Sequence, residues 1–287
     1  MTAAELADSV SDLDFSRFQA LVYREAGIHL APCKKPLLAG RLSRRMRELG
    51  ISSLAQYYRR VGEQPDELVR MLDAISTNET HFFREPAHFD VLRSRILPAW
   101  QAEAAAGRRP RRLRAWSAAC STGQEPYTLA MVLLDHLGGD GWEIEVQGTD
   151  LSTRVLETAR GAVWPLDLAR EIPRPYLKKY MLRGTGSQAD RMMAGPEIRA
   201  LVRFSRLNLN ADDYAVQGQF DLIFCRNVLI YFDAASKRRV VDRLVDRLAP
   251  GGLLFMGHAE SLTTVTTRVR PVLPTVYAVP PSAGAGG

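Results

Sequence analysis

The polar residues best placed to hold a ligand follow the ends of two expected strands. The stretch Trp116–Pro126 begins as a buried strand, continues with small residues and reaches an acid, Glu125, at the start of a helix. Small residues let a ligand approach the backbone closely, and a carboxylate in the first turn of a helix meets the positive end of its dipole. The next strand ends at Asp150. An acid at the end of the second strand of a strand–helix–strand unit holds ribose hydroxyls in nucleotide-binding sheets.

The glycine content of this turn narrows the class of ligand. Only Gly123 is a glycine between residues 118 and 125, so the G-x-G-x-x-G pattern of dinucleotide enzymes is missing. A pyrophosphate needs those close-approach glycines, and Glu125 would repel it. A cationic ligand would not be repelled. The alternative is an ordinary turn of such a fold that holds no ligand.

The composition indicates a globular protein with two domains of ordinary size. The chain has 287 residues, of which 46% are hydrophobic and 24% charged. No apolar run approaches the roughly 18 residues of a membrane span, and the N-terminal residues lack the basic and apolar parts of a secretory signal. The cysteines and histidines show neither disulfide nor zinc spacing. We therefore expect a cytoplasmic protein, not inserted in a membrane and without a bound metal.

The positive charge is concentrated in two arginine-rich segments. The formal net charge of +6 is compatible with nucleic acid, an acidic membrane surface or an acidic protein as partner. One segment, residues 108–114, is expected to be a solvated edge. The other is an expected helix whose apolar face comprises Leu37, Leu38, Leu42, Met46 and Leu49. The opposite, solvent-facing side of that helix should then carry Arg41, Arg44, Arg45 and Arg47.

The order of the expected elements predicts an α/β protein with an all-helical N-terminal domain. Helical periodicity without strand signals extends from residue 14 to about 76, and strands alternate with helices from residue 111 onward. That alternation favours a mostly parallel, doubly wound sheet. The predicted divisions are a helical domain at 1–90 with a linker helix to about 110, an α/β domain at 111–280, a small antiparallel insert at about 180–206, and a disordered tail at 281–287.

Six blocks of the sequence, in the same order, resemble the motifs of the CheR-type chemotaxis receptor methyltransferases. They are Ser76–Glu85, Trp116–Tyr127, Thr149–Ser152, Asn208–Leu209, Phe224–Asp233 and Leu248–Ser261, and the resemblance covers about residues 14–280. It implies a Rossmann-like methyltransferase sheet with an N-terminal all-α domain and a small antiparallel β insert. It also implies a protein-glutamate O-methyltransferase that takes its methyl group from S-adenosyl-L-methionine (SAM) and leaves S-adenosyl-L-homocysteine. A sulfonium cation needs no phosphate cradle, which suits the glycine-poor turn.

The resemblance also implies which residues bind the cofactor. Asp150 is expected to hold the ribose hydroxyls, and Glu125 to lie near the methionine ammonium or the turn at the strand end. Asn208 and Leu209 would line the adenine. The methionine end would be completed by Asn78, Thr80, Arg84, Arg226 and Asn227. Most of these residues also have a plain structural role open to them. Asp150, Asn78 and Thr80 could be helix caps, Glu125 a first-turn acid, Asn208 an Asx-turn, and Arg84 part of an ion pair between domains.

Two residues are the candidates for catalysis. The acceptor, a glutamate carboxylate with an ordinary pKa of ~4.3, is already ionised at neutral pH and needs no general base. Arg84 is expected to orient it by charge-assisted hydrogen bonds, and Tyr231 to donate a second bond, although Tyr231 could instead be a core aromatic residue. Alignment of the reacting atoms is then the main means of accelerating the reaction.

The expected partners are the acidic cytoplasmic helices of chemoreceptors, docked through Arg41, Arg44, Arg45 and Arg47 by a protein that is a monomer. In some members of the family the β insert binds a peptide at the receptor C-terminus. Two other functions stay open. One is a SAM methyltransferase for a small molecule or nucleic acid, although the basic clusters have no interleaved aromatic residues and we predict no nucleic-acid partner. The other is a SAM-binding module without transfer activity.

Overall fold

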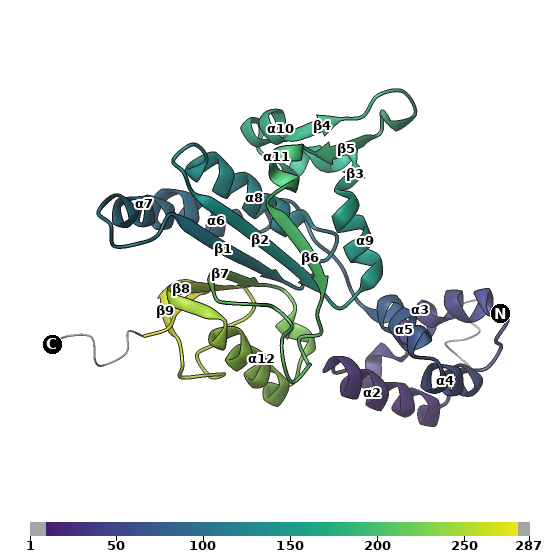
Figure 1. Ribbon diagram of the computed structural model, residues 1–287. Coiled ribbons are helices and arrows are strands. Elements are labelled where there is room, and N and C mark those ends of the chain that lie inside the picture. The colour runs from purple at the N-terminus through teal and green to yellow at the C-terminus, as the bar shows by residue number, and fades with distance from the viewer. Residues whose placement is uncertain (1–9, 281–287) are drawn as a thin grey trace.

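An all-helical domain and an α/β domain with a small separate sheet make up the molecule (Figure 1). The structure, a computed structural model, describes residues 10–280, so the tail predicted at 281–287 lies outside the described residues. The predicted fold class is confirmed: the α/β domain has a mostly parallel sheet, and an antiparallel group of strands lies beside it. Among the described residues, every helix is too short or too polar to span a lipid bilayer.

The helical domain forms where apolar residues recur at helical spacing between good caps. Ser11 caps the start of α2 (Asp12–Ala26) by accepting a hydrogen bond from the Asp14 backbone, and Gly27 ends this helix in the left-handed conformation, with φ 70°. Phe18 and Tyr57 are fully buried at the centre of this domain. The elements are α2 (Asp12–Ala26), η1 (Pro32–Lys34), α3 (Lys35–Glu48), α4 (Leu54–Glu63) and α5 (Pro65–Ile75).

A segment without regular structure, residues 76–85, leads from this domain into the α/β domain. It is followed by a nearly continuous helical stretch made of α6 (Pro86–Val91), a π-helical turn η2 (Leu92–Ile96) and α7 (Leu97–Ala105). Leu92 and Leu97 on this stretch are fully buried in the core of the α/β domain. The segment 76–85 is therefore held at both of its ends by packed helices.

The main sheet has the strand order β6-β2-β1-β7-β8-β10-β9. Pairing is parallel from β6 to β8, and β10 and β9 are antiparallel additions at one edge. Strands β2 and β6 are thus added on one side of β1, and the later strands β7 to β10 are added on the other. The strands are β1 (Arg112–Ala118), β2 (Glu143–Asp150), β6 (Val202–Arg206), β7 (Phe220–Cys225), β8 (Leu248–Met256), β9 (Arg270–Leu273) and β10 (Val276–Ala278).

Helices cover both faces of this sheet, as expected for a sheet whose central strands are parallel. Alternate residues of β7 show the two faces. Leu222 and Phe224 pack into the core that contains α7 and α8 (Gln124–Leu137), whereas Ile223 and Cys225 pack into the core that contains α12 (Ala234–Asp246). Helix α9 (Thr153–Gly161) connects β2 to the small sheet and packs against β6.

The small sheet differs from the range 180–206 predicted for it. Its strands are β3 (Val163–Pro165), β4 (Met181–Arg183) and β5 (Arg191–Ala194), all antiparallel, with η3 (Leu166–Glu171), α10 (Arg174–Tyr180) and η4 (Gly186–Gln188) between them. The short helix α11 (Pro196–Arg199) then returns the chain to the main sheet. Strand β6 belongs to the main sheet, where it pairs in parallel with β2. Its residue Val202 is buried opposite Val146.

Helix α3 does not have the simple apolar and solvent faces predicted from its periodicity. Leu37, predicted to be a core residue, is 41% exposed. Arg41, predicted to face solvent, turns instead toward the segment between the domains, where it donates to the hydroxyl of Thr77 at 2.9 Å and to the carbonyl of Ile75. Both corrections have one cause: this side of α3 lies along a cleft between the domains, where polar and apolar side chains are both half-exposed.

Arg45 is also not a solvent-facing residue. Its guanidinium donates to both oxygens of Glu67, at 2.9 and 2.6 Å, and Glu67 in turn accepts from the hydroxyl of Tyr57 at 2.9 Å. Glu67 is 3% exposed, so Arg45 neutralises a buried carboxylate between α3 and α5. Of the four predicted docking arginines, the two that are exposed as predicted are Arg44 and Arg47.

Candidate functional site

One cleft gathers the predicted site residues. It has a volume of about 410 Å³ and lies between the helical domain and the carboxyl ends of the strands. We call its two sides the inner wall, formed by the loops after β1, β2, β6 and β7, and the outer wall, formed by the helical domain and residues 76–85. Every residue predicted to bind or catalyse lines it: Asn78, Thr80, Arg84, Glu125, Asp150, Asn208, Leu209, Arg226, Asn227 and Tyr231.

The inner wall is where the strand order reverses. The chain moves from β1 to β2 on one side, and the later strands β7 and β8 lie on the other. Ligands of open α/β sheets bind outside the strand ends at such a switch point. The turn after β1 is tight, with Ala119 and Ser121 at positive φ, and Gly123 has φ 95°. A Cβ at Gly123 would lie 2.9 Å from the Cβ of Ala159, so glycine also permits α8 to pack on α9.

Asp150 is a buried acceptor at the end of β2. It is 8% exposed, and its two carboxylate oxygens accept the backbone N–H groups of Ser121 and Ser152 at 2.8 and 2.9 Å. Burial raises the pKa of the Asp150 carboxyl, and the backbone N–H groups oppose that rise. The side chain that caps α9 is Ser152, so Asp150 is free of the capping role considered for it. Each oxygen keeps a further lone pair for a hydroxyl donor.

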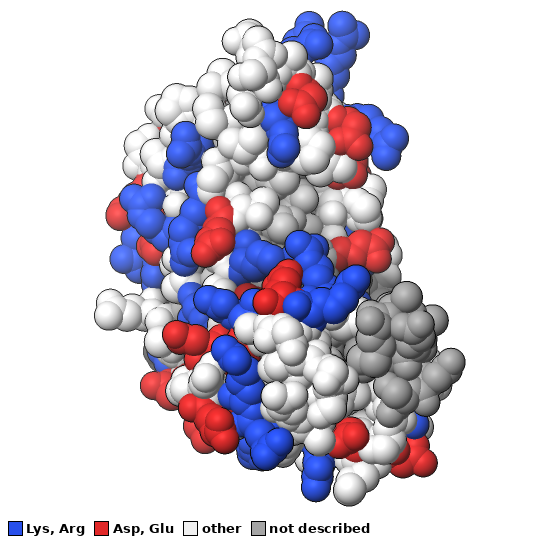
Figure 2. All heavy atoms as spheres, turned by 90° about the vertical axis from the view of Figure 1, so that its right-hand side faces the viewer, with Lys and Arg blue, Asp and Glu red and all other residues white. Residues whose placement is uncertain are grey.

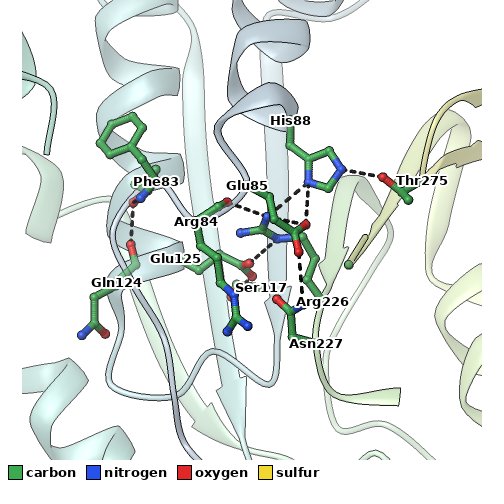
Figure 3. Close-up of polar contacts among 12 residues, drawn as sticks. Phe83, Arg84, Glu85, His88, Ser117, Gln124, Glu125, Arg226, Asn227 and Thr275 are labelled. Carbon is green, nitrogen blue, oxygen red and sulfur yellow. Dashed lines mark hydrogen bonds and ion pairs between the residues drawn. The ribbon is translucent and has the colours of Figure 1, made fainter. Parts of the chain in front are cut away.

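Arg226 forms the floor of the cleft. Its side chain is 1% exposed, and its guanidinium donates to Glu125 Oε2 at 2.7 Å, to the carbonyl oxygen of Arg84 at 2.7 Å and to Glu85 Oε2 at 3.3 Å (Figure 3). The other oxygen of Glu125 accepts from Ser117 at 2.7 Å. The Arg226–Glu125 pair therefore ties the end of β7 to the start of α8, and it shapes the cleft more than it offers free groups to a ligand.

His88 completes this network as a neutral imidazole. Burial, and then the charge of Arg226, lowers the pKa of His88 to about 4. Arg226 Nη1 lies 3.2 Å from His88 Nδ1, so Nδ1 is the acceptor and Nε2–H donates to Thr275 Oγ1 at 2.7 Å. His88, Glu85 and His258 bring ligand atoms within 4.8 Å of one another. The guanidinium of Arg226 lies 3.3 Å from Glu85 Oε2 and 3.2 Å from His88 Nδ1, and its positive charge opposes a metal cation at that point.

The outer wall is a segment pinned along its backbone. Ser121 donates to the carbonyl oxygen of Asn78 at 2.8 Å, and Arg226 donates to that of Arg84. The amide Nδ2 of Asn78 is buried and has no hydrogen-bond partner among the described residues. The Arg84 side chain donates to the carbonyl of Glu79 at 3.0 Å, and its guanidinium lies apart from that of Arg226 (Figure 3). A fixed backbone thus presents one orphaned amide and one accessible cation.

Asn208 and Leu209 join the two domains as well as lining the cleft. The amide nitrogen of Asn208 donates to the carbonyl oxygen of Glu25 at the end of α2, and its oxygen accepts from the Asn210 backbone at 2.9 Å. This is the Asx-turn that was the alternative role for Asn208. Leu209 is buried, at 6% exposure, and offers an apolar surface. Tyr231 is half-buried, and its carbonyl accepts from the His29 backbone at 2.8 Å.

Sequence reasoning missed two acids of this region, Glu85 and Glu260. Glu85 accepts from Asn227 Nδ2 at 3.1 Å and from the backbone of His258 at 3.2 Å, and Glu260 accepts three backbone N–H groups. Both lie inside motif blocks quoted above, next to residues that were chosen. For Glu260 the signal would have been an acid shortly after a buried strand, β8, similar to the signal that identified Asp150. Glu85 directly precedes helix α6, and no strand end marks it.

The cleft fits a ligand with a ribose, a flat apolar part and a polar tail. Its volume lies within the range of small-molecule sites. It offers the acceptor oxygens of Asp150, the apolar side chain of Leu209 and the orphaned donor of Asn78. A buried donor without a partner costs free energy until a ligand satisfies it. These are the requirements of SAM, with the carboxylate of its amino-acid tail as the group for Asn78.

Comparison with known proteins follows the same division of the chain. The family model of the CheR methyltransferase all-alpha domain matches residues 13–76, and that of the CheR methyltransferase SAM binding domain matches residues 78–278. Chemotaxis protein methyltransferase 2 of Pseudomonas aeruginosa is 40% identical over 92% of this chain and 92% of its own. The chemotaxis protein methyltransferases of Escherichia coli and Klebsiella aerogenes are 38% and 39% identical, over 94% and 90% of this chain and 92% and 86% of theirs.

Proposed function

Because this chain belongs to the CheR methyltransferase family, we propose that it methylates glutamate side chains on the cytoplasmic helices of chemoreceptors. It is a SAM-dependent methyltransferase of chemotaxis, with SAM as its cofactor. The finer statement, a protein-glutamate O-methyltransferase acting in the cytoplasm as a monomer, is the proposal. The observation that carries it is the cleft itself, in which a cofactor-shaped inner wall faces an accessible cation, Arg84.

The inner wall supplies most of what SAM needs, and Asn78 of the outer wall completes it. Asp150 accepts from the ribose hydroxyls, Leu209 packs against the adenine, and Asn78 donates to the carboxylate of the methionine part. Asn227 faces the same end, above the Arg226–Glu125 floor. When bound, SAM supplies a methyl carbon on a sulfonium sulfur. A carboxylate oxygen that attacks this carbon forms a methyl ester, and the carbon–sulfur bond breaks to leave S-adenosyl-L-homocysteine.

Arg84 of the outer wall and Tyr231 of the inner wall supply what the acceptor needs. A glutamate is ionised at neutral pH, so the residues must orient it and need not remove a proton. Arg84 donates charge-assisted hydrogen bonds to the incoming carboxylate, and the Tyr231 hydroxyl donates another. Arg84 is not committed to a carboxylate of the protein, because its described bond is to a backbone carbonyl. Alignment of this kind is the main source of rate enhancement when no proton is transferred.

The side of α3 that faces the cleft is suited to an acidic amphipathic helix. Lys34, Leu37 and Arg41 are spaced by three and four residues, so they form one stripe, and all three line the cleft. The stripe alternates cation, apolar residue and cation. Arg44 and Arg45, in contrast, are paired with Glu48 and Glu67. We therefore propose that the docking charge lies on this stripe, in preference to the four arginines together.

A wider basic surface continues from this stripe. On the face of the molecule that carries α3, α5 and α9, lysine and arginine side chains gather in a band across the middle (Figure 2). Exposed arginines on these helices include Arg44, Arg47, Arg70 and Arg154. A basic band next to the cleft steers acidic partners toward it and aligns them, more than it holds them. The glutamate-rich helices of receptors have the complementary charge.

The proposal is tested by incubating the protein and SAM with receptor cytoplasmic fragments and mapping the product by mass spectrometry. A methyl group on glutamate residues of the fragments is the expected result. Methylation confined to nucleic acid or to a small molecule would replace the proposed acceptor with another class. SAM binding without methylation of any fragment, across a panel that includes the receptors of the same cell, would mean a binding module.

A further inference from the structure

Glu260, in the loop after β8, holds two loops together through their backbones. Its Oε2 accepts the N–H groups of Asn227 and Gly257 at 2.7 and 2.9 Å, and its Oε1 accepts that of Leu229 at 2.7 Å. Two of these donors belong to the loop after β7, and one belongs to the loop after β8. One carboxylate therefore holds the β7 loop of the inner wall against the neighbouring loop after β8.

The burial of this carboxylate is costly enough to need an explanation. Glu260 is 6% exposed, and no ion pair found within residues 10–280 includes it. A buried charge without an opposite charge is expensive unless hydrogen bonds satisfy it fully. Three backbone N–H groups do so here, and hydrogen bonds to a charged acceptor are stronger than those between neutral groups. The cost of burial is thus offset by a loop held in one conformation.

The loop that Glu260 holds carries the residues that face the cofactor and the acceptor. Asn227 has φ 58°, a left-handed conformation that is uncommon for a residue with a side chain. Its backbone is held by Glu260, and its side-chain nitrogen donates to Glu85 at 3.1 Å (Figure 3). Leu229 begins the turn η5 (Leu229–Tyr231), which ends at Tyr231 in the cleft. Asn227 and Tyr231 are therefore placed by the same carboxylate.

We infer that Glu260 is a positioning residue, which fixes Asn227 at the cofactor end and Tyr231 at the acceptor end of one loop. The inference rests on the proposed function for Tyr231 and on the cofactor site alone for Asn227. A merely structural Glu260 would lower stability without favouring these two residues. A positioning Glu260 acts through them, so its removal matters less once they are absent.

The test is a pair of double-mutant cycles on Glu260→Gln. A glutamine keeps the shape, but its amide nitrogen faces an N–H group, so at least one of the three bonds is lost. We expect the dissociation constant of SAM to rise roughly 5-fold and the rate of methyl transfer to fall roughly 50-fold. In the Asn227→Ala background, Glu260→Gln should weaken SAM binding less than about 2-fold. In the Tyr231→Phe background it should slow transfer less than about 5-fold.

Two further variants separate positioning from stability. Glu67→Gln removes another buried carboxylate, in the helical domain and away from the cleft, so it should lower the melting temperature and leave SAM binding unchanged. Gly257→Ala keeps all charges, but its added Cβ would lie 2.7 Å from both Asn227 Nδ2 and Glu260 Oε2. It should push the same loop aside and reproduce the loss of SAM affinity. This variant also keeps the test open if Glu260→Gln does not fold.

The outcomes are distinct from those that test the proposed function. The Asn227 cycle needs only SAM binding, so it stands even if no receptor fragment is methylated. The inference would be overturned if Glu260→Gln had the same fold-effect in the Asn227→Ala and Tyr231→Phe backgrounds as in the parent protein. It would also be overturned by folded Glu260→Gln and Gly257→Ala proteins with unchanged SAM affinity and unchanged rate.

Discussion

The inner and outer walls of the cleft are built on opposite plans. On the inner wall, Asp150 and Arg226 are buried, and their charged groups are hydrogen-bonded by the protein itself. On the outer wall, Lys34 and Leu37 are exposed, and Lys34, Arg41 and Arg84 take part in no ion pair found within residues 10–280. The charged groups of the inner wall are thus satisfied by the protein before any ligand binds. These cations of the outer wall are not paired with a carboxylate of the described residues.

This difference indicates what each wall recognises. A wall with fixed groups suits one ligand of constant shape, because little ordering remains to be done on binding. A wall of exposed cations and one apolar side chain suits partners that share a charge pattern but differ in detail, as receptor helices do. Under the proposed function, the cofactor and the acceptor would be recognised by different physical means within a cleft of about 410 Å³.

The largest effect should come from Asp150, the acid of the inner wall. Asp150→Ala removes two acceptor oxygens for the ribose hydroxyls. We expect SAM affinity to fall by about 100-fold, or about 3 kcal/mol, in calorimetry. The matched control is Asp73→Asn, since Asp73 is also a buried acid nearby but accepts from Thr153 outside the cleft. A loss of SAM affinity below 3-fold in Asp150→Ala would remove the distinction between the walls.

The next effect should come from Arg84, on the outer wall. Arg84→Ala leaves the inner wall intact, so we expect transfer to receptor fragments to slow by roughly 30-fold, about 2 kcal/mol, while SAM affinity changes less than 3-fold. Single-turnover rates and SAM binding are measured on the same preparation. Equal losses in rate and in SAM affinity would assign Arg84 to the cofactor and contradict its role in orienting the acceptor.

The pH dependence of stability should report on the floor of the inner wall. The pKa of His88 is about 4 in the folded protein and near 6.5 in an unfolded chain, so between these values the unfolded state binds a proton that the folded state does not. Stability contributed by neutral His88 is therefore present above pH 6.5 and is lost as pH falls toward 4. We expect a loss on the order of 2 kcal/mol after allowing for solvent screening.

The measurement is chemical denaturation of the parent protein and of His88→Gln at several pH values from 7 to 4.5. The glutamine variant should show a shallower decline than the parent across this window. If the free energy of unfolding declined equally with pH in the two proteins, protonation of His88 would not be the cause of the decline.

The smallest effect should come from Lys34, at the rim of the outer wall. Lys34→Glu reverses one charge of the stripe on α3, so the KM for an acidic receptor fragment should rise by roughly 5-fold at low salt, and the difference should shrink as salt is added. SAM affinity should not change. Arg112→Glu makes the same charge change at the opposite, amino-terminal edge of the sheet, where it should be silent. Equal effects of the two variants would indicate a general charge effect and no docking stripe.

Sequence reasoning reached the inner wall because strand ends are marked locally. Asp150 ends a strand, Asn227 follows one closely, and Glu125 comes after the turn that follows another. The carboxyl ends of parallel strands meet at one edge of a sheet. The resemblance then named the remaining cleft residues, including Asn78 and Arg84. Fold class, cofactor and the gathering of residues on one cleft followed from these two signals.

What sequence reasoning missed depends on which elements meet. Helical periodicity divides α3 into faces but does not tell that α5 brings Glu67 against Arg45, or that Leu37 borders a cleft. In the same way, β6 was assigned to the insert because the identity of a strand's partner, here β2, is not written in the strand. Glu85 and Glu260 were passed over since a buried acid looks like a surface acid until its donors are known.

The central claim, that the acceptor is a carboxylate, is tested most directly by the chemistry of the product. Receptor cytoplasmic fragments are labelled with SAM that carries a radioactive methyl group, and the washed protein is treated with mild base. We predict that the label leaves the protein as volatile methanol, because a methyl ester is hydrolysed under these conditions. Label that stays on the protein through this treatment would mean transfer to nitrogen or carbon and would contradict the account.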